Sequence, residues 1–366
     1  MVSEIHQPRV LIVDDSAENI QALIEVLKHE YVLVAETDGE RALALALREP
    51  YPDLILLDVV MPGIDGYEVC RRLKDDARTR DIPVIFVTLR DDEIGEMHGF
   101  DLGAVDYIAK PIVPCIVRAR VKTHIGLKQY QDKLSALVET RTRQLQLTQE
   151  ITIHAMASLA EYRDPETGGH IKRTQNYVKI LAQHLQKHPK FSGCFNNVEI
   201  EALYRSAPLH DIGKVGIQDS ILLKPGKLTE DEFERMKEHV IIGRDAIISC
   251  EKRLGRDSFL KYAHEIAESH HEKWDGSGYP YGLKGEKIPI SGRLMAIADV
   301  YDALISKRVY KPPLPHSEAV KYILENRSIH FDPLMVDIFE EIHELFRETA
   351  LQYTDHEEEK EMLKKK

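Results

Sequence analysis

Histidines and carboxylates in the second half of the chain are spaced in a way that could hold metal ions. His210 and Asp211 are adjacent in the run LHDIGKVG, and His270 and His271 are adjacent in HHEKWDGSGYP. Neighbouring residues of a helix point about 100° apart, so each pair could present two ligands to neighbouring metals but not easily to one. Imidazole and carboxylate donors without thiolates favour iron, manganese, nickel or zinc over calcium.

Four further residues complete the candidate ligand set. Glu166 and His170 are four residues apart, which would place them on one face of a helical turn, and His239 and Asp299 each lie in an amphipathic pattern. Such a set is too large for one ion and suffices for two or three with bridging carboxylates. Two ions about 3.5–4 Å apart lower the pKa of a shared water and stabilise the attacking and leaving oxygens. The set therefore predicts hydrolysis of a phosphoester.

A second group of polar residues follows short apolar runs in the first half of the chain. The runs are residues 10–13, 32–34, 54–57, 84–87 and 105–108. They alternate with helical patterns such as 18–27 and 40–47, which predicts a doubly wound α/β domain with a parallel five-stranded sheet. Ligands of such sheets lie beyond the carboxyl ends of the strands. The polar residues expected there are Asp14, Asp15, Asp58, Thr88 and Lys110.

Converging carboxylates repel one another unless a cation neutralises them, and oxygen ligands suit Mg²⁺. A lysine and a hydroxyl beside the ion would complete a site for phosphoryl transfer onto a carboxylate. With these polar residues in this order along the predicted α/β sheet, residues 8–125 resemble a response-regulator receiver domain. The residues that carry the resemblance are Asp14-Asp15, Asp58 followed by VVMPGIDG, Thr88, Tyr107 and Lys110-Pro111.

The receiver resemblance implies a role for each of these residues. Asp58 would be the phospho-acceptor. The implied Mg²⁺ ligands are Asp15 directly, Asp14 through water, and the carbonyl of Val60. The implied contacts of the phosphoryl oxygens are Thr88 and Lys110, with Tyr107 as the aromatic switch. The Lys110–Pro111 bond is expected to be cis.

From Ile153 to Phe339 the chain resembles the HD-GYP family, a branch of the HD phosphohydrolases. The resemblance rests on the motifs RDPETGGH, HDIGKVGI, ILLKPGKL, EHVIIG, HHEKWDGSGYPYGLKGEKIP and ADVYDALISKRVYK. It implies an all-α domain with a metal-dependent phosphodiesterase activity that opens cyclic di-GMP to pGpG or GMP. It also implies two or three first-row ions, with iron preferred and manganese, nickel or zinc as alternatives.

Individual roles follow from the same resemblance. The residues that match the family's metal-binding positions are Glu166, His170, His210, Asp211, His239, His270, His271 and Asp299. Asp211 and Lys214 are the expected catalytic residues, with Lys214 against a substrate phosphate. Arg308 and Lys311 would hold phosphate oxygens, and Tyr279 in the Gly-Tyr-Pro turn would contact the substrate. In the family a glutamate at the Glu166 position goes with a third ion, and the turn is often a surface for partner proteins.

The other histidines of this half match no ligand position and are interpreted as surface or satisfied core residues. They are His154, His184, His188, His264, His316, His330, His343 and His356.

Composition and charge set the broad class. The chain has 366 residues, a hydrophobic fraction of 43% and a formal net charge of −12. No apolar run reaches the roughly 20 residues of a membrane helix and no export signal precedes the first domain, so we expect a cytoplasmic protein without membrane contact. The acidic balance argues against direct DNA binding. The expected domains are a flavodoxin-like receiver domain (1–125), a helical linker (119–149), the HD-GYP domain (150–350) and a charged, solvated tail (351–366).

The linker could pair with a copy of itself. Apolar or large residues recur in a 3-4-3 spacing at Leu127, Tyr130, Leu134, Leu137, Leu145 and Thr148. This spacing favours a coiled coil and a homodimer. The alternative is a solitary helix that packs on one of its own domains.

The favoured hypothesis is a two-component response regulator that hydrolyses cyclic di-GMP. A sensor histidine kinase would phosphorylate Asp58, and the linker helix would transmit the change to the metal site. One alternative is a signalling scaffold that binds the dinucleotide and acts through the Gly-Tyr-Pro turn. Another is a hydrolase of a different cyclic dinucleotide or of pGpG.

Overall fold

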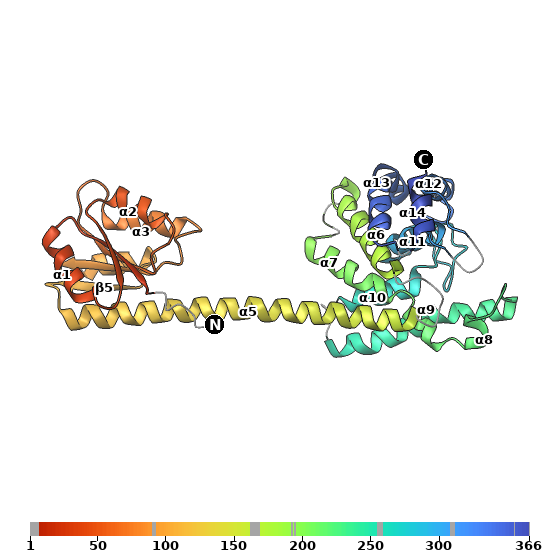
Figure 1. The fold of residues 1–366 in the computed structure, drawn as a ribbon, viewed down its shortest axis with the longest axis horizontal. Coiled ribbons are helices and arrows are strands. Elements are labelled where there is room, and N and C mark those ends of the chain that lie inside the picture. The colour runs from red at the N-terminus through yellow and green to blue at the C-terminus, as the bar shows by residue number, and fades with distance from the viewer. Residues whose placement is uncertain are drawn as a thin grey trace. The chain divides into compact units, whose positions relative to one another are not determined.

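The computed structural model describes residues 7–89, 93–161, 169–191, 193, 195–254, 259–307, 312–354 and 356–365. The chain divides into two compact units, Met1–Arg143 and Gln144–Lys366, drawn from red to yellow and from yellow to blue in Figure 1. Among the described residues, no helix is long and apolar enough to cross a membrane.

The first unit is built on a five-stranded parallel sheet in the order β2-β1-β3-β4-β5. The strands are β1 (Arg9–Val13), β2 (Val32–Glu36), β3 (Leu54–Asp58), β4 (Val84–Leu89) and β5 (Asp106–Lys110). The predicted doubly wound sheet is therefore confirmed. Strands β3 and β5 run to Asp58 and Lys110, so these two residues end their strands rather than follow them.

Helices cover both faces of the sheet, because successive residues of a strand point to opposite sides. The helices are α1 (Ala17–Leu27), α2 (Gly39–Ala46), α3 (Gly66–Asp75), α4 (Glu93–Asp101) and the first turns of α5 (Pro114–Glu161). Val10 and Ile12 of β1 pack with α1 and α5, whereas Leu11 and Val13 pack with α2 and α3. The two cores hold the carboxyl ends of β1, β3, β4 and β5 along one edge of the sheet.

Helix α5 is longer than the predicted 119–149. Its first turns bury Val117, Val121 and Ile125 in the core of the first unit, and its last turns bury Ile153 and Ala157 in the second. Every residue from 129 to 149 is exposed. The predicted range is too short at both ends of α5. The first and last turns of the helix carry core residues of the adjoining units and lack the 3-4-3 spacing of apolar residues by which the linker was predicted.

The described residues of the second unit are helical, as predicted. The main helices are α6 (Gly169–Leu185), α7 (Asn197–Ser206), α8 (Asp219–Leu222), α9 (Glu230–Leu254), α10 (Leu260–Ser269), α11 (Ile290–Ile305), α12 (His316–Glu325), α13 (Pro333–Gln352) and α14 (Glu357–Lys364). Four short 3₁₀ turns stand between them: η1 (Pro189–Phe191), η2 (Ala207–Leu209), η3 (Ile212–Gly216) and η4 (Gly285–Lys287). Helices α6, α11, α12 and α13 share one apolar core.

The predicted solvated tail at 351–366 is wrong. Helix α13 continues to Gln352, and α14 follows it, packed against α11, α12 and α13. Leu363 is 1% exposed within the main core, and the buried Glu359 accepts a hydrogen bond from the backbone N–H of Lys307. Because most residues of this segment are charged, its sequence pattern did not indicate that Leu363 packs into the core or that Glu359 binds a backbone N–H group.

Candidate functional site

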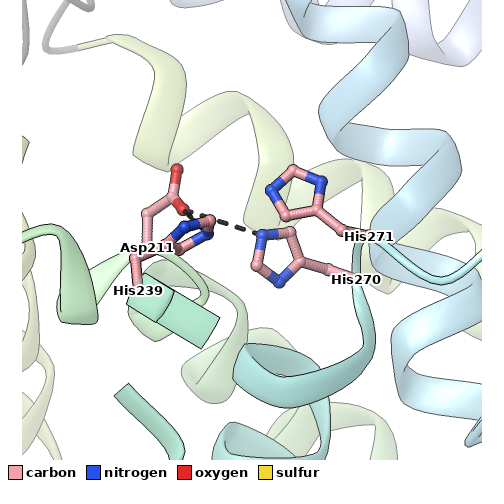
Figure 2. Close-up of side chains that lie close together, drawn as sticks. All are labelled: Asp211, His239, His270 and His271. Atoms are coloured by element: carbon pink, nitrogen blue, oxygen red, sulfur yellow. Dashed lines mark ion pairs between the residues drawn. The ribbon is translucent and has the colours of Figure 1, made fainter. Parts of the chain in front are cut away.

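Four predicted ligands converge on one point in the second unit (Figure 2). His239 lies on α9, Asp211 lies between η2 and η3, and His270 and His271 follow the last residue of α10. Each offers a ligand atom within 4.8 Å of the others. His270 and His271 both place a ring nitrogen in this group, although the helical offset between adjacent residues disfavours two such neighbours as ligands of one ion.

A close backbone contact makes this convergence possible. A Cβ atom on Gly213 would lie 1.9 Å from the carbonyl oxygen of His239, so only glycine lets η3 approach α9 and place Asp211 beside His239. A Cβ atom on Gly278 would lie 2.3 Å from the backbone nitrogen of Lys273. The turn after His271 therefore folds back tightly, and the N–H of Tyr279 donates to the His271 carbonyl.

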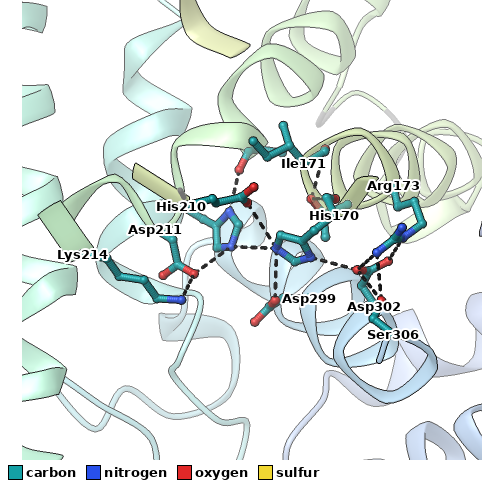
Figure 3. A network of polar contacts seen from close by, with 12 residues as sticks. His170, Ile171, Arg173, His210, Asp211, Lys214, Asp299, Asp302 and Ser306 are labelled. Carbon is teal, nitrogen blue, oxygen red and sulfur yellow. Dashed lines mark hydrogen bonds and ion pairs between the residues drawn. The ribbon is translucent and has the colours of Figure 1, made fainter. Parts of the chain in front are cut away.

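A second group of ligands adjoins the first across Asp211 (Figure 3). His170 on α6, His210 and Asp299 on α11 offer ligand atoms within 4.8 Å of one another. His210 Nε2 lies 3.2 Å from Asp211 Oδ2, while His239 Nε2 lies 3.2 Å from Asp211 Oδ1. One carboxylate thus faces both groups, which is the geometry of a bridging ligand.

The buried imidazoles point their Nε2 atoms into the site because their Nδ1 atoms are engaged elsewhere. The Nδ1 atoms of His210, His239 and His270 lie 3.0, 2.7 and 3.0 Å from the backbone carbonyls of Ala207, Met236 and Ile266. An N–H at Nδ1 donates to each carbonyl, which leaves Nε2 unprotonated and able to bind a metal.

Buried polar atoms without a hydrogen-bond partner indicate whether these residues suit a metal ion. Among the described residues, the buried atoms Asp211 Oδ1, His239 Nε2 and His270 Nε2 have no hydrogen-bond partner. Leaving a buried acceptor unpaired costs about 1–3 kcal/mol, so three on one point call for a cation. Nitrogen and carboxylate donors suit first-row transition metals. The residues present therefore fit the metal centre that the sequence predicts.

Metal binding needs neutral imidazole and ionised carboxylate, and the charge states of His270, His271 and Asp211 agree with it. For His210, burial favours the neutral ring, but the neighbouring Asp211 carboxylate raises its pKa. Burial lowers the pKa of His270 and holds that of His271 well below its usual range. Burial would raise the pKa of Asp211, but the positive charge of Lys214 and the contact with His210 hold it well below its usual range. Asp211 is thus a carboxylate in this setting.

Two expected substrate-contacting residues lie at the edge of the ligand set. Lys214 Nζ lies 2.8 Å from Asp211 Oδ2. The Tyr279 ring stacks on His271 at 4.7 Å between ring centroids, and burial raises the pKa of its hydroxyl. Glu272 accepts hydrogen bonds from the backbone N–H groups of Tyr281 and Leu283 and so holds the turn closed.

Sequence reasoning missed two carboxylates beside His170. Asp302 Oδ2 lies 2.9 Å from His170 Nδ1, and Arg173 binds both oxygens of Asp302 at 2.7 and 2.8 Å (Figure 3). Glu161, at the end of α5 and 8% exposed, places Oε1 4.0 Å from His170 Nε2. The available signal for Asp302 was its position three residues after Asp299, on the same face of α11. Glu161 carries no such signal.

Three predicted residues, Glu166, Arg308 and Lys311, lie outside the described residues.

The phosphoryl site of the first unit has the predicted composition. Asp14, Asp15 and Asp58 offer oxygens within 4.8 Å of one another, and Lys110 Nζ lies 2.8 Å from Asp58 and 2.9 Å from Asp14. Burial raises the pKa of Asp58 despite its bond to Lys110. The Lys110–Pro111 bond is cis, as predicted.

The predicted switch residues lie behind this site. Thr88 and Tyr107 line one cavity of about 10 Å³, together with Phe86 and Phe100. Val60, whose carbonyl is the expected Mg²⁺ ligand, has a side chain that is 70% exposed next to Asp58.

Comparison with known proteins matches both units. Residues 10–122 match the response regulator receiver domain, and residues 154–335 match the HD domain. A Vibrio cholerae protein named "Probable cyclic di-GMP phosphodiesterase" is 47% identical over 97% of this chain and 82% of its own. A second from that species, named "Cyclic di-GMP phosphodiesterase", is 54% identical over 60% of this chain and 44% of its own. The Xanthomonas campestris "Cyclic di-GMP phosphodiesterase response regulator RpfG" is 38% identical over 78% of this chain and 74% of its own.

Replacing Asp302 should weaken the metal centre without removing a ligand. Asp302→Asn loses the carboxylate that accepts the Nδ1–H of His170, and we expect metal affinity to fall about 10–100-fold. Equilibrium dialysis against Mn²⁺ measures the change. Ser306→Ala is the control, because Ser306 accepts a hydrogen bond from Arg173 and donates one to Asp302, so the change perturbs the same network and keeps the Asp302 carboxylate. Equal affinities in the two variants would show that Asp302 does not position His170.

Proposed function

We propose that this chain, which belongs to the family of cyclic di-GMP phosphodiesterase response regulators with a receiver domain and an HD domain, hydrolyses the phosphodiester bonds of cyclic di-GMP. The observation that carries the proposal is the position of Asp211, whose two oxygens face separate groups of ligands. This geometry supports at least two ions that share a carboxylate. We expect the products pGpG or GMP, and iron as the preferred metal.

Bound ions would supply Lewis acidity to the phosphate and favour in-line attack by water. The protein's own residues orient the substrate and transfer protons. Water adds to phosphorus and gives up a proton to solvent, the bond to the leaving oxygen breaks, and that oxygen takes a proton from Lys214 Nζ at the edge of the ligand set. Lys214 then regains a proton from solvent, so that the net reaction is the addition of one water. Tyr279, stacked on His271, closes one side of the site and offers its hydroxyl to the substrate.

Turnover of cyclic di-GMP by Mn²⁺-loaded protein tests the proposal. We expect Asp211→Asn to abolish hydrolysis together with metal binding, because it removes the shared carboxylate. We expect Lys214→Met to lower kcat about 100-fold with metal content unchanged, because it removes a proton donor. Lys227→Met, at an exposed position of the same segment, is the control.

The same assay separates the alternative functions. Tight binding of cyclic di-GMP with no hydrolysis by iron- or manganese-loaded protein would overturn the proposal and favour a scaffold that acts through the Gly-Tyr-Pro turn. Faster turnover of pGpG or of a mixed-base cyclic dinucleotide would assign a different substrate.

We further propose that the centre binds three ions, with Glu166 as a ligand of the third. Metal analysis of protein purified without oxygen should count three ions per chain in the wild type and two in Glu166→Gln. Glu161→Gln is the matched variant, because Glu161 Oε1 lies 4.0 Å from His170 Nε2 and Glu161 is absent from the predicted ligand set. Loss of the third ion in Glu161→Gln alone would move the assignment to Glu161, and two ions in the wild type would refute it.

We propose that a sensor histidine kinase phosphorylates Asp58, with Mg²⁺ held by Asp14 and Asp15, and that the chain acts in the cytoplasm as a homodimer paired through α5. The pairing is supported by apolar side chains on the exposed part of this helix. Leu127, Tyr130, Leu134, Leu137 and Leu145 are 49–67% exposed. Burying each leucine against a second copy would stabilise the pair by about 1.5–3 kcal/mol.

Beryllofluoride, a phosphate mimic, tests this regulation. It should change the oligomeric state or the hydrolysis rate of the wild type and leave Asp58→Ala unchanged. Leu134→Glu should give a monomer that does not respond, because it places charge in the pairing face, whereas the neighbouring exposed Lys133→Glu should not. Sedimentation velocity and turnover are measured together. A wild type that responds in neither would refute the proposal.

A further inference from the structure

A second cluster of metal-binding side chains lies away from the catalytic ligands, between α12 and α13. His316 is the first residue of α12, and His343 and Glu344 are on α13. His316 Nε2 lies 2.9 Å from His343 Nδ1, and Glu344 Oε1 lies 3.7 Å from each of these nitrogens. The three ligand atoms therefore form a small triangle that opens toward the surface.

We propose that His316, His343 and Glu344 bind a divalent transition metal ion such as Zn²⁺, independently of the catalytic centre. In a tetrahedral zinc site with bonds of about 2.0–2.1 Å, ligand atoms lie about 3.3 Å apart. The observed separations of 2.9 and 3.7 Å bracket this value. A shift of a few tenths of an ångström in each side chain would complete three corners of the tetrahedron and leave the fourth to water.

The fold holds the most buried ligand in place. His316 is 5% exposed, and its Nδ1 lies 2.8 Å from the hydroxyl of Tyr301, a residue with no exposed surface. This contact occupies Nδ1 and directs Nε2 toward His343. The side chains of His343 and Glu344 are 29% and 53% exposed, which gives an ion a path from solvent.

The surrounding charges permit a cation. Burial, with a smaller effect from His343, lowers the pKa of His316 to about 4, so the ring is neutral as a ligand must be. Arg347 opposes a cation, but it binds Oε2 of Glu344 at 2.6 Å and leaves Oε1 facing the histidines. Without an ion the same geometry is a hydrogen bond between two imidazoles, and this is the competing interpretation.

Metal counting on the full chain distinguishes the two. Wild type, His343→Gln and Glu344→Gln are incubated with Zn²⁺, dialysed against metal-free buffer and analysed for bound zinc. We expect His343→Gln to hold one ion fewer per chain than the wild type, and Glu344→Gln to bind that ion at least about tenfold more weakly. His356→Gln, an exposed histidine of the same unit outside the cluster, should match the wild type.

Two further readouts guard against a mere folding defect. The zinc-dependent rise in melting temperature should shrink in His343→Gln relative to His356→Gln, because a lost site removes its share of binding free energy. Turnover of cyclic di-GMP should be equal in both, since neither residue belongs to the catalytic ligand set. Equal zinc content and an equal zinc-dependent rise in His343→Gln and the wild type would refute the site and leave the hydrogen-bonded pair.

Discussion

The helical unit depends on a buried carboxylate that is shared between two groups of imidazoles. Asp211 is 9% exposed, and five histidines and Lys214 gather around it or around its neighbours. Removing so many polar groups from water is costly unless each finds a partner. In the described part of the chain, the buried atoms Asp211 Oδ1, His239 Nε2 and His270 Nε2 have no hydrogen-bond partner and face one point, where a bound metal would offset the cost.

Helix α11 connects the positions of the predicted ligands to the packing of the rest of the unit. Asp299, a predicted ligand, and Asp302, which contacts His170, project to one side. Tyr301 projects into the main core beside Phe339 and Phe346. The buried pair of Arg173 and Asp302 then fixes α6 against α11. Breaking such a pair from one side leaves an unpaired buried charge, which costs about 3–5 kcal/mol. The packing of the core and the positions of the predicted ligands therefore depend on each other.

Motif spacing predicted the ligands better than it predicted their grouping. The sheet and the residues Asp14, Asp58 and Lys110 followed from alternating patterns, because strand ends meet at one edge. The grouping of His270 with His271 could not follow, since it depends on how both rings are directed toward Asp211 and His239, which lie on other parts of the chain. Asp302 escaped notice because its role requires His170, 132 residues away, to lie beside it. His343 also appeared unremarkable, because its partner His316 is on another helix.

The exposed middle of α5 is the part of the structure that a single chain explains least. Isolated helices in water are marginal, and most helical stability in proteins comes from packing of an apolar face. Residues 129–149 are all exposed in the described structure, yet they include Leu134, Leu137 and Leu145. The net charge of the chain does not explain this exposure, because a polar surface would serve a solitary helix better than exposed leucines. In the proposed homodimer, a second helix that covers these leucines would supply this packing, so pairing would stabilise the helix itself as well as serve regulation.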